Sequence, residues 1–156
     1  MHPRAAEFRE QARDRYGFEP DVQEFPEGTK TAADAAAAVG CDVAQIASSI
    51  VVDTEDGLAV VVTSGANRLD MDAVAAELGA GSAGMADADS ISEVVGWSIG
   101  GVPPFCHATD VPVLLDETLL THEQVWAAAG TPEAVFPLSP TELRNLSGGR
   151  PTDVAE

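Results

Sequence analysis

The stretch Ser49-Ile50-Val51-Val52-Asp53-Thr54-Glu55-Asp56-Gly57-Leu58-Ala59-Val60-Val61-Val62-Thr63 decides how this chain folds. Two apolar runs rich in β-branched residues flank a short polar segment that ends in Asp-Gly, a strong signal for a β-hairpin. Because both runs are almost entirely apolar, we expect both strands to be buried on both faces. The sequence therefore predicts a central hairpin covered by other elements.

Helices and further strands are predicted on both sides of this hairpin. Capping residues and glycines delimit helices at 2–16, 31–39, 70–78, 89–95 and 139–146, and a turn is expected at 26–28. Short strands are expected at 22–25, 83–86, 96–99, 111–115, 125–130 and 134–138. Helices and strands are mixed rather than strictly alternating, which favours an α+β (mixed α/β) domain. We expect one domain over residues 1–146 and a disordered tail over 147–156.

The charge of the chain is strongly acidic. Its 156 residues carry a formal net charge of -18, and Lys30 is the only lysine. A hydrophobic content of 45% argues against disorder, so we interpret the excess carboxylates as the surface of a protein from a salt-adapted halophile. In ordinary salt this surface disfavours nucleic acid, because phosphate binding needs Lys and Arg, but it does not exclude such a partner.

The cysteines and histidines do not form a recognisable metal or disulfide pattern. Cys41 and Cys106 are too few for a disulfide framework, and together with His107 and His122 they lack metal-ligand spacing. The first seventeen residues are charged throughout, and no apolar run reaches membrane-spanning length. We therefore expect a soluble cytoplasmic protein with no membrane partner, no metal and no cofactor.

The stretch Gly96-Trp97-Ser98-Ile99-Gly100-Gly101-Val102-Pro103-Pro104-Phe105-Cys106-His107 is the most informative about function. An apolar run that we interpret as a strand ends in two glycines and then two prolines. Glycine lets a ligand approach the main chain, and proline fixes the shape of a loop. A rigid loop with a bare backbone is suited to hold a small substrate by its polar groups.

Several blocks, in order, resemble the YbaK/prolyl-tRNA-synthetase-associated family of aminoacyl-tRNA editing domains. They are Thr31-Ala-Ala-Asp-Ala-Ala-Ala-Ala-Val-Gly40, Gln45-Ile-Ala-Ser-Ser-Ile-Val-Val52, Asn67-Arg-Leu-Asp70, Gly100-Gly-Val-Pro-Pro-Phe105, Pro112-Val-Leu-Leu-Asp-Glu117 and Ser139-Pro140. The resemblance spans about residues 30 to 146. It implies a mixed, barrel-like sheet surrounded by helices, and hydrolysis of the ester that joins a wrong amino acid to tRNA.

The resemblance also implies where the site lies. Gly100 and Gly101 would orient the ester through main-chain groups, and Ser48 would stand among the catalytic residues. The expected substrate-binding residues are Ile46, Pro103, Pro104, Phe105, Cys106, His107 and Asp116. For Asp116 two roles remain open, since its carboxylate could bind an amino group or cap the next turn. The implied partner is the aminoacylated 3′ end of tRNA, not DNA, and a homodimer or a loose association with a synthetase remains open.

Two departures from the family pattern leave alternatives open. Ser48 stands where the family usually has a lysine, and losing a charge-assisted contact costs about 1.5–3 kcal/mol. Cys106 stands where the family often has glycine. The first hypothesis is a free-standing trans-editing deacylase. The second is an attenuated binding module that holds an aminoacyl-adenosine-like ligand or a protein partner. A thiol hydrolase built on Cys106 and His107 is disfavoured, because adjacent side chains on an extended segment point to opposite sides.

Overall fold

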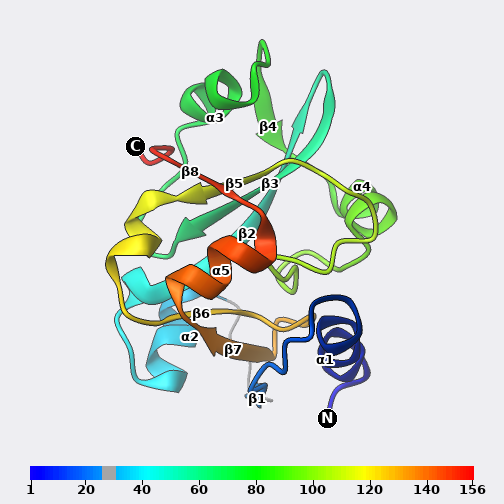
Figure 1. Ribbon diagram of the computed structural model, residues 1–156. Helices are drawn as coiled ribbons and strands as arrows, with labels where there is room; N and C mark the ends of the chain where they lie inside the picture. Colours follow the sequence, from blue (N-terminus) through cyan, green and yellow to red (C-terminus); the bar gives the residue numbers. More distant parts are fainter. Residues whose placement is uncertain (26–30) are drawn as a thin grey trace.

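The computed structural model of the protein describes residues 1–25 and 31–156 (Figure 1). The predicted turn at 26–28 and Lys30 lie outside these residues. The described part contains one eight-stranded mixed sheet in the order β1-β7-β6-β2-β3-β5-β8, with β4 paired to β2. Five helices surround it, so the predicted α+β class with a mixed sheet and surrounding helices is confirmed. No helix in the described part is long and apolar enough to span a membrane.

The elements have the following bounds. The strands are β1 (Gln23–Glu24), β2 (Ile46–Thr54), β3 (Gly57–Ser64), β4 (Ala83–Met85), β5 (Val113–Asp116), β6 (Val125–Ala128), β7 (Ala134–Leu138) and β8 (Arg150–Thr152). The helices are α1 (Pro3–Tyr16), α2 (Ala32–Val39), α3 (Met71–Leu78), α4 (Ala88–Ser90) and α5 (Pro140–Ser147). Two 3₁₀ turns, η1 (Val43–Gln45) and η3 (Glu117–Thr121), precede β2 and β6, and a π-helical turn, η2 (Ile91–Val95), extends α4.

The predicted hairpin is confirmed as β2 and β3. These strands pair from Ala47 with Ser64 to Thr54 with Gly57, and the turn between them is Glu55-Asp56. Alternate residues of β3 enter two different cores, since Val60 and Val62 belong to the larger core and Val61 to a smaller one on the opposite face. Burial on both faces explains why residues 58–62 of β3 are apolar at every position.

The edge of β2 opposite β3 is shared by two short strands that do not meet. Parallel β6 pairs with Ile46 and Ala47 at the start of β2. Antiparallel β4 pairs with residues 52–54 at its end. Residues 48–50 therefore pair with β3 alone, and a window of unpaired backbone lies between β6 and β4. This window positions the candidate site.

Two sequence-based predictions about the periphery are wrong. Residues 96–99 form no strand, because Gly96 ends η2 in a left-handed conformation and Trp97 turns into the core, where it is 2% exposed. The tail 147–156 was expected to be disordered, but its residues 150–152 form strand β8. Strand β8 pairs in parallel with β5, and Val154 is fully buried against the smaller core. The tail contains few apolar residues. Its pairing with β5 provides backbone hydrogen bonds that this composition does not reveal.

Candidate active site

A cleft opens beside the unpaired window of β2. It encloses about 230 Å³ and is lined by β2 residues 46–51, the end of β6, Met85 of β4, the start of α2 and the loop that carries Gly100. Of the residues predicted for the site, the structure brings Ile46, Ser48 and Gly100 to this cleft. Ser48 and the loop that carries Gly100 therefore adjoin the same cleft.

The walls of the cleft are mostly apolar. Among the described residues, hydrophobic side chains from six different elements line it, among them Ala35, Ile46, Ile91, Trp126 and Val135. The polar side chains among the described lining residues are the hydroxyls of Thr31, Ser48 and Ser49, and none of these residues is charged. Thr31 is already engaged, because its Oγ1 accepts a hydrogen bond from Asp34 N–H at 3.0 Å and caps α2. The two serines are thus the main polar side chains that a ligand would meet.

Ser48 and Ser49 point to opposite faces of β2, because side chains alternate along a strand. Ser49 shares its face with Ala47 and Val51, which belong to the larger core. Its Oγ is buried and has no hydrogen-bond partner within residues 1–25 and 31–156. The sequence did not single out Ser49, since a serine beside Ser48 in a strand looks like an ordinary strand residue.

The backbone of Ser49 also faces the window. Val51 accepts a hydrogen bond from Ala86 N–H at 3.1 Å on the edge of β2 opposite β3. In an antiparallel pair, residues two apart direct their N–H and C=O groups to the same edge. Ser49 therefore presents its N–H and C=O between the end of β6 and the end of β4. A donor, an acceptor and a hydroxyl are concentrated at one residue.

A tight turn brings Gly100 to the rim of the cleft. Gly101 N–H donates to the Ser98 carbonyl at 2.9 Å, and Gly100 has a φ of +85° at the third position of this turn. A positive φ there is the signature of a type II turn and favours glycine. Within the described part of the chain, Gly100 N–H donates no hydrogen bond to another group. It is therefore available to a ligand.

Gly101 lies behind this turn rather than at the cleft. Its N–H is used by the turn, and a Cβ at this position would lie 2.7 Å from Thr131 Cα. The close packing against Thr131 explains the second glycine of the pair. The structure does not support the expectation that Gly101 offers its amide to a substrate.

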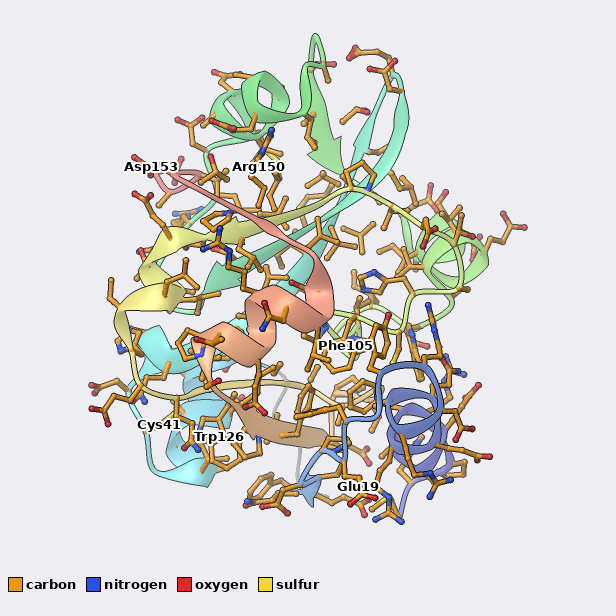
Figure 2. The ribbon with its side chains drawn as sticks, viewed as in Figure 1. Glu19, Cys41, Phe105, Trp126, Arg150 and Asp153 are labelled. Atoms are coloured by element: carbon orange, nitrogen blue, oxygen red, sulfur yellow. The ribbon has the colours of Figure 1, made fainter. Side chains whose placement is uncertain are left out.

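The residues from Pro103 to His107 are buried and do not line the cleft. Figure 2 shows Phe105 beside α1, whose Phe8 and Tyr16 rings it contacts. The Phe105 ring packs against Phe8 and Phe136, at centroid distances of 5.5 and 5.9 Å. His107 Nε2–H donates to the Pro103 carbonyl at 2.8 Å, and burial lowers the pKa of the imidazole. The structure therefore places Pro103, Pro104, Phe105, Cys106 and His107 as the support of the loop, not as its ligand-facing part.

Cys106 has the geometry and protonation of a structural residue. Burial raises the pKa of its thiol to about 12, so the thiolate needed for nucleophilic attack is absent at neutral pH. Its φ of +66° is unusual for a residue with a Cβ. Trp97 Nε1–H donates to the Cys106 carbonyl at 2.9 Å, and Cys106 N–H donates to Tyr16 Oη at 3.4 Å. These two hydrogen bonds hold the backbone of Cys106 in this unusual conformation.

Asp116 lies outside the cleft and acts as a cap. Its carboxylate accepts hydrogen bonds from Thr63 Oγ1–H and Ser64 N–H, both at 3.1 Å, and from Asn67 Nδ2–H at 2.9 Å. Its other oxygen accepts from Thr118 N–H at 3.0 Å and caps η3. The sequence left open whether Asp116 binds an amino group or caps the next turn. In the structure its carboxylate caps η3.

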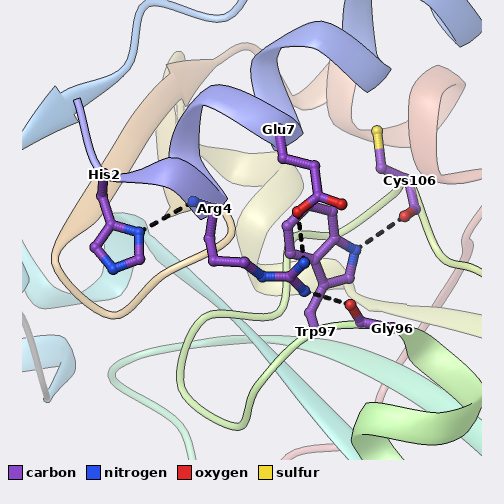
Figure 3. Close-up of polar contacts among 6 residues, drawn as sticks. All are labelled: His2, Arg4, Glu7, Gly96, Trp97 and Cys106. Atoms are coloured by element: carbon purple, nitrogen blue, oxygen red, sulfur yellow. Dashed lines mark hydrogen bonds and ion pairs between the residues drawn. The ribbon is translucent and has the colours of Figure 1, made fainter.

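Helix α1 holds the base of the loop that carries Gly100 (Figure 3). The Arg4 guanidinium donates to the Gly96 carbonyl and lies 4.2 Å from the centroid of the Trp97 ring. About three turns further along α1, Arg15 donates to the His107 carbonyl at 3.2 Å. The loop is thus fixed at both ends by one helix. No group of three or more His, Cys, Asp or Glu side chains in the described ranges could hold a metal ion.

Comparison with known proteins defines the class to which this fold and cleft belong. The model of the aminoacyl-tRNA editing domain matches residues 26–146, and the chain belongs to this family. Among curated relatives, the uncharacterized protein YwhH of Bacillus subtilis is 32% identical over 134 residues, which cover 85% of each protein. Helix α1 precedes the range that the family model matches.

Solved structures resemble the whole chain. One, described as a "putative trans-editing enzyme for prolyl tRNA synthetase", is 39% identical with a TM-score of 0.94, covering 100% of this chain and 99% of its own. A scaffold protein used for epitope backbone grafting is 38% identical, with the same TM-score and coverage. The hypothetical protein APE2540 is 28% identical with a TM-score of 0.84, covering 94% of this chain and 98% of its own.

Proposed function

We propose that this protein hydrolyses the ester bond of misacylated tRNA in trans. The observation that carries the proposal is the position of the Gly100 N–H at the rim of a cleft beside the unpaired window of β2. Membership of the aminoacyl-tRNA editing family supplies the substrate class. The acyl group would lie in the cleft, and the terminal adenosine would lie outside it.

Catalysis in this proposal depends on the backbone. The Gly100 N–H would donate to the ester carbonyl and stabilise the oxyanion as water attacks, which for a single donor is worth about 2.7–4 kcal/mol. A free hydroxyl of the terminal ribose would help to position that water. A side-chain nucleophile is not required, and the one cysteine of the loop has a buried, protonated thiol.

Ser48 would make a weak polar contact near the ribose and phosphate. A serine hydroxyl donates one hydrogen bond and carries no charge. The ammonium group of the family lysine donates hydrogen bonds and also carries a positive charge. The difference of about 1.5–3 kcal/mol predicts a slow deacylase relative to lysine-containing relatives. A second candidate function follows from the same observation. With no charged side chain among the described lining residues, the cleft also suits a binding module that does not turn over its ligand.

Deacylation of a panel of misacylated tRNAs, in dilute and in molar salt, separates the two candidates. We expect the wild-type protein to release at least one amino acid, and the Ser48→Lys variant to release it faster. Gly100→Ala should lower the rate, because its φ of +85° is strained for alanine and its Cβ would lie 3.3 Å from Pro132 Cγ. Gly100→Asn, which tolerates a positive φ, should retain more activity.

The opposite result is equally specific. If no misacylated tRNA is hydrolysed at any enzyme concentration while an aminoacyl-adenosine amide still binds, the protein is a binding module. If Cys106→Ala abolishes turnover while the folded state persists, the backbone mechanism is wrong and the thiol hydrolase replaces it.

A further inference from the structure

The buried hydroxyl of Ser49 is a polar group without an internal role. In the described part of the chain, its Oγ is the buried side-chain oxygen or nitrogen atom that lacks a hydrogen-bond partner. Buried polar groups are nearly always satisfied, so an exception calls for a functional explanation. Ser49 also lines the cleft, which makes a bound ligand the natural partner of this hydroxyl.

The position of Ser49 indicates which part of a ligand it would meet. Its side chain points to the same face of β2 as Ala47 and Val51, toward the larger core. It therefore lies at the inner wall of the cleft, whereas Gly100 lies at the exposed rim. An ester carbonyl held at the rim would direct the amino-acid side chain inward, toward Ser49.

The charged α-amino group of an aminoacyl ester is a poor partner for this inner position. No described residue that lines the cleft carries a carboxylate. Burying an ammonium group without a counter-charge is expensive, so the amino group would remain near the solvent-exposed rim. The side chain of the amino acid is the remaining part of the acyl group that can reach Ser49.

The size of the cleft limits that side chain. Its volume of about 230 Å³ lies below the usual range for drug-sized ligands, which is roughly 300–1,000 Å³. Apolar groups such as Ile91 and Trp126 surround the rest of the space. A small side chain with one hydrogen-bonding group would fit both the volume and the single unpaired hydroxyl.

We infer that Ser49 is a specificity-determining residue that selects aminoacyl esters whose small side chain carries a hydroxyl group. The inference rests on the proposed function, because it assigns the substrate class to the same cleft. A site that can hydrogen-bond a substrate hydroxyl discriminates against an analogue that lacks it, because the buried group of the site is then left unpaired.

Matched substrate pairs test this inference. Threonyl and valyl esters of one tRNA exchange a hydroxyl for a methyl group at nearly constant volume, and seryl and alanyl esters differ by the hydroxyl alone. We expect the wild-type protein to prefer the hydroxyl-bearing member of each pair by about tenfold to a hundredfold in kcat/KM. In Ser49→Ala this preference should collapse toward unity, mainly by loss of activity on the hydroxyl-bearing esters. Ser48→Ala, on the opposite face of β2, should retain the preference.

Binding of non-hydrolysable analogues keeps the inference separate from the proposed function. The probes are 3′-amide analogues of seryl- and alanyl-adenosine, measured by calorimetry with wild type and Ser49→Ala. A preference for the seryl analogue that Ser49→Ala removes supports the subsite even if no ester is hydrolysed. Equal affinity of wild type for the two analogues, or a preference that Ser49→Ala leaves intact, overturns the inference while leaving deacylation to its own assay. The thermal stability of Ser49→Ala, which should equal or exceed that of wild type, verifies that the variant is folded.

Discussion

The guanidinium of Arg4 lies over the indole ring of Trp97, 4.2 Å from its centroid, and donates to the carbonyl of the preceding residue, Gly96. This contact joins the first turn of α1 to the base of the loop that presents Gly100. The same helix turn packs on Gly130, where a Cβ would lie 2.8 Å from both the Arg4 carbonyl oxygen and Trp97 Cζ3. Helix α1 is therefore part of the scaffold of the cleft, although it lies outside the range of the family match.

Replacing Arg4 with Met should loosen this scaffold. The change keeps an apolar stem and removes the cation and the donor, so we expect a loss of about 1–3 kcal/mol in the free energy of unfolding. Denaturant titration followed by tryptophan fluorescence measures the loss. Arg9→Met is the matched control, because Arg9 is exposed on the same helix and should change stability by less than about 0.5 kcal/mol. Equal effects of the two changes would contradict a specific role for Arg4.

Gly101→Ala should destabilise the fold, although the adjacent Gly100 lies at the exposed rim of the cleft. The new Cβ would lie 2.7 Å from Thr131 Cα and 2.9 Å from Thr131 N, and backbone atoms cannot move aside cheaply. We expect a cost of about 1–3 kcal/mol, typical of overpacking, visible as a lower midpoint of unfolding. Gly84→Ala is a suitable control, because a Cβ there meets no atom within 4 Å. A fully stable Gly101→Ala would show that the loop can move away from Thr131.

Stability should fall at acidic pH through Asp116. Burial favours the protonated carboxyl, but hydrogen bonds from Asn67, Ser64 and Thr118 outweigh it, so the pKa of Asp116 is lowered below 3.8. The unfolded state then binds a proton at a higher pH than the folded state does. The stabilisation is therefore complete above the unfolded pKa and is lost as pH falls through the folded one.

The measurement is the free energy of unfolding between pH 6 and pH 2 for wild type and Asp116→Asn. The variant should be less stable at pH 6, because an amide cannot replace the carboxylate as an acceptor at both oxygens. It should also lose less stability than wild type toward low pH. Parallel curves for the two proteins would show that Asp116 does not titrate differently in the folded state.

The two thiols should react at different rates. Cys106 is buried with a pKa of about 12, so an alkylating reagent at pH 8 should not modify it in the native protein. Cys41 is only partly buried, and although burial and the nearby Asp42 raise its pKa, it should react first. Mass spectrometry of tryptic peptides, before and after unfolding, gives the order. Modification of native Cys106 ahead of Cys41 would contradict its role as a structural residue.

Much of the fold could be predicted from local sequence signals. Short stretches of sequence predict the hairpin of β2 and β3, the N-cap at Thr31 and the glycine that ends α2. The structure contains all three. The strand expected at Trp97 is absent because a distant contact decides its conformation. Its indole donates to the carbonyl of Cys106, which no local pattern reveals.

The candidate site was predictable only in part, for the same reason. Ile46, Ser48 and Gly100 line the cleft, and their roles toward a substrate stay a prediction from the resemblance. Ser49 was missed because its unpaired state depends on where β6 and β4 stop along β2, and strand ends set by long-range pairing are not visible in the sequence. Asp116 was ambiguous because a carboxylate after a strand serves equally well as a ligand or a cap.

The window on β2 has a consequence for how such proteins diversify. The groups it offers are backbone N–H and C=O groups, which every amino acid except proline supplies, so exchanges among the surrounding side chains leave them in place. Under the proposed function, a descendant of this chain could therefore come to accept a different acyl group by altering a few positions around the opening, while the backbone groups of the window stay in place.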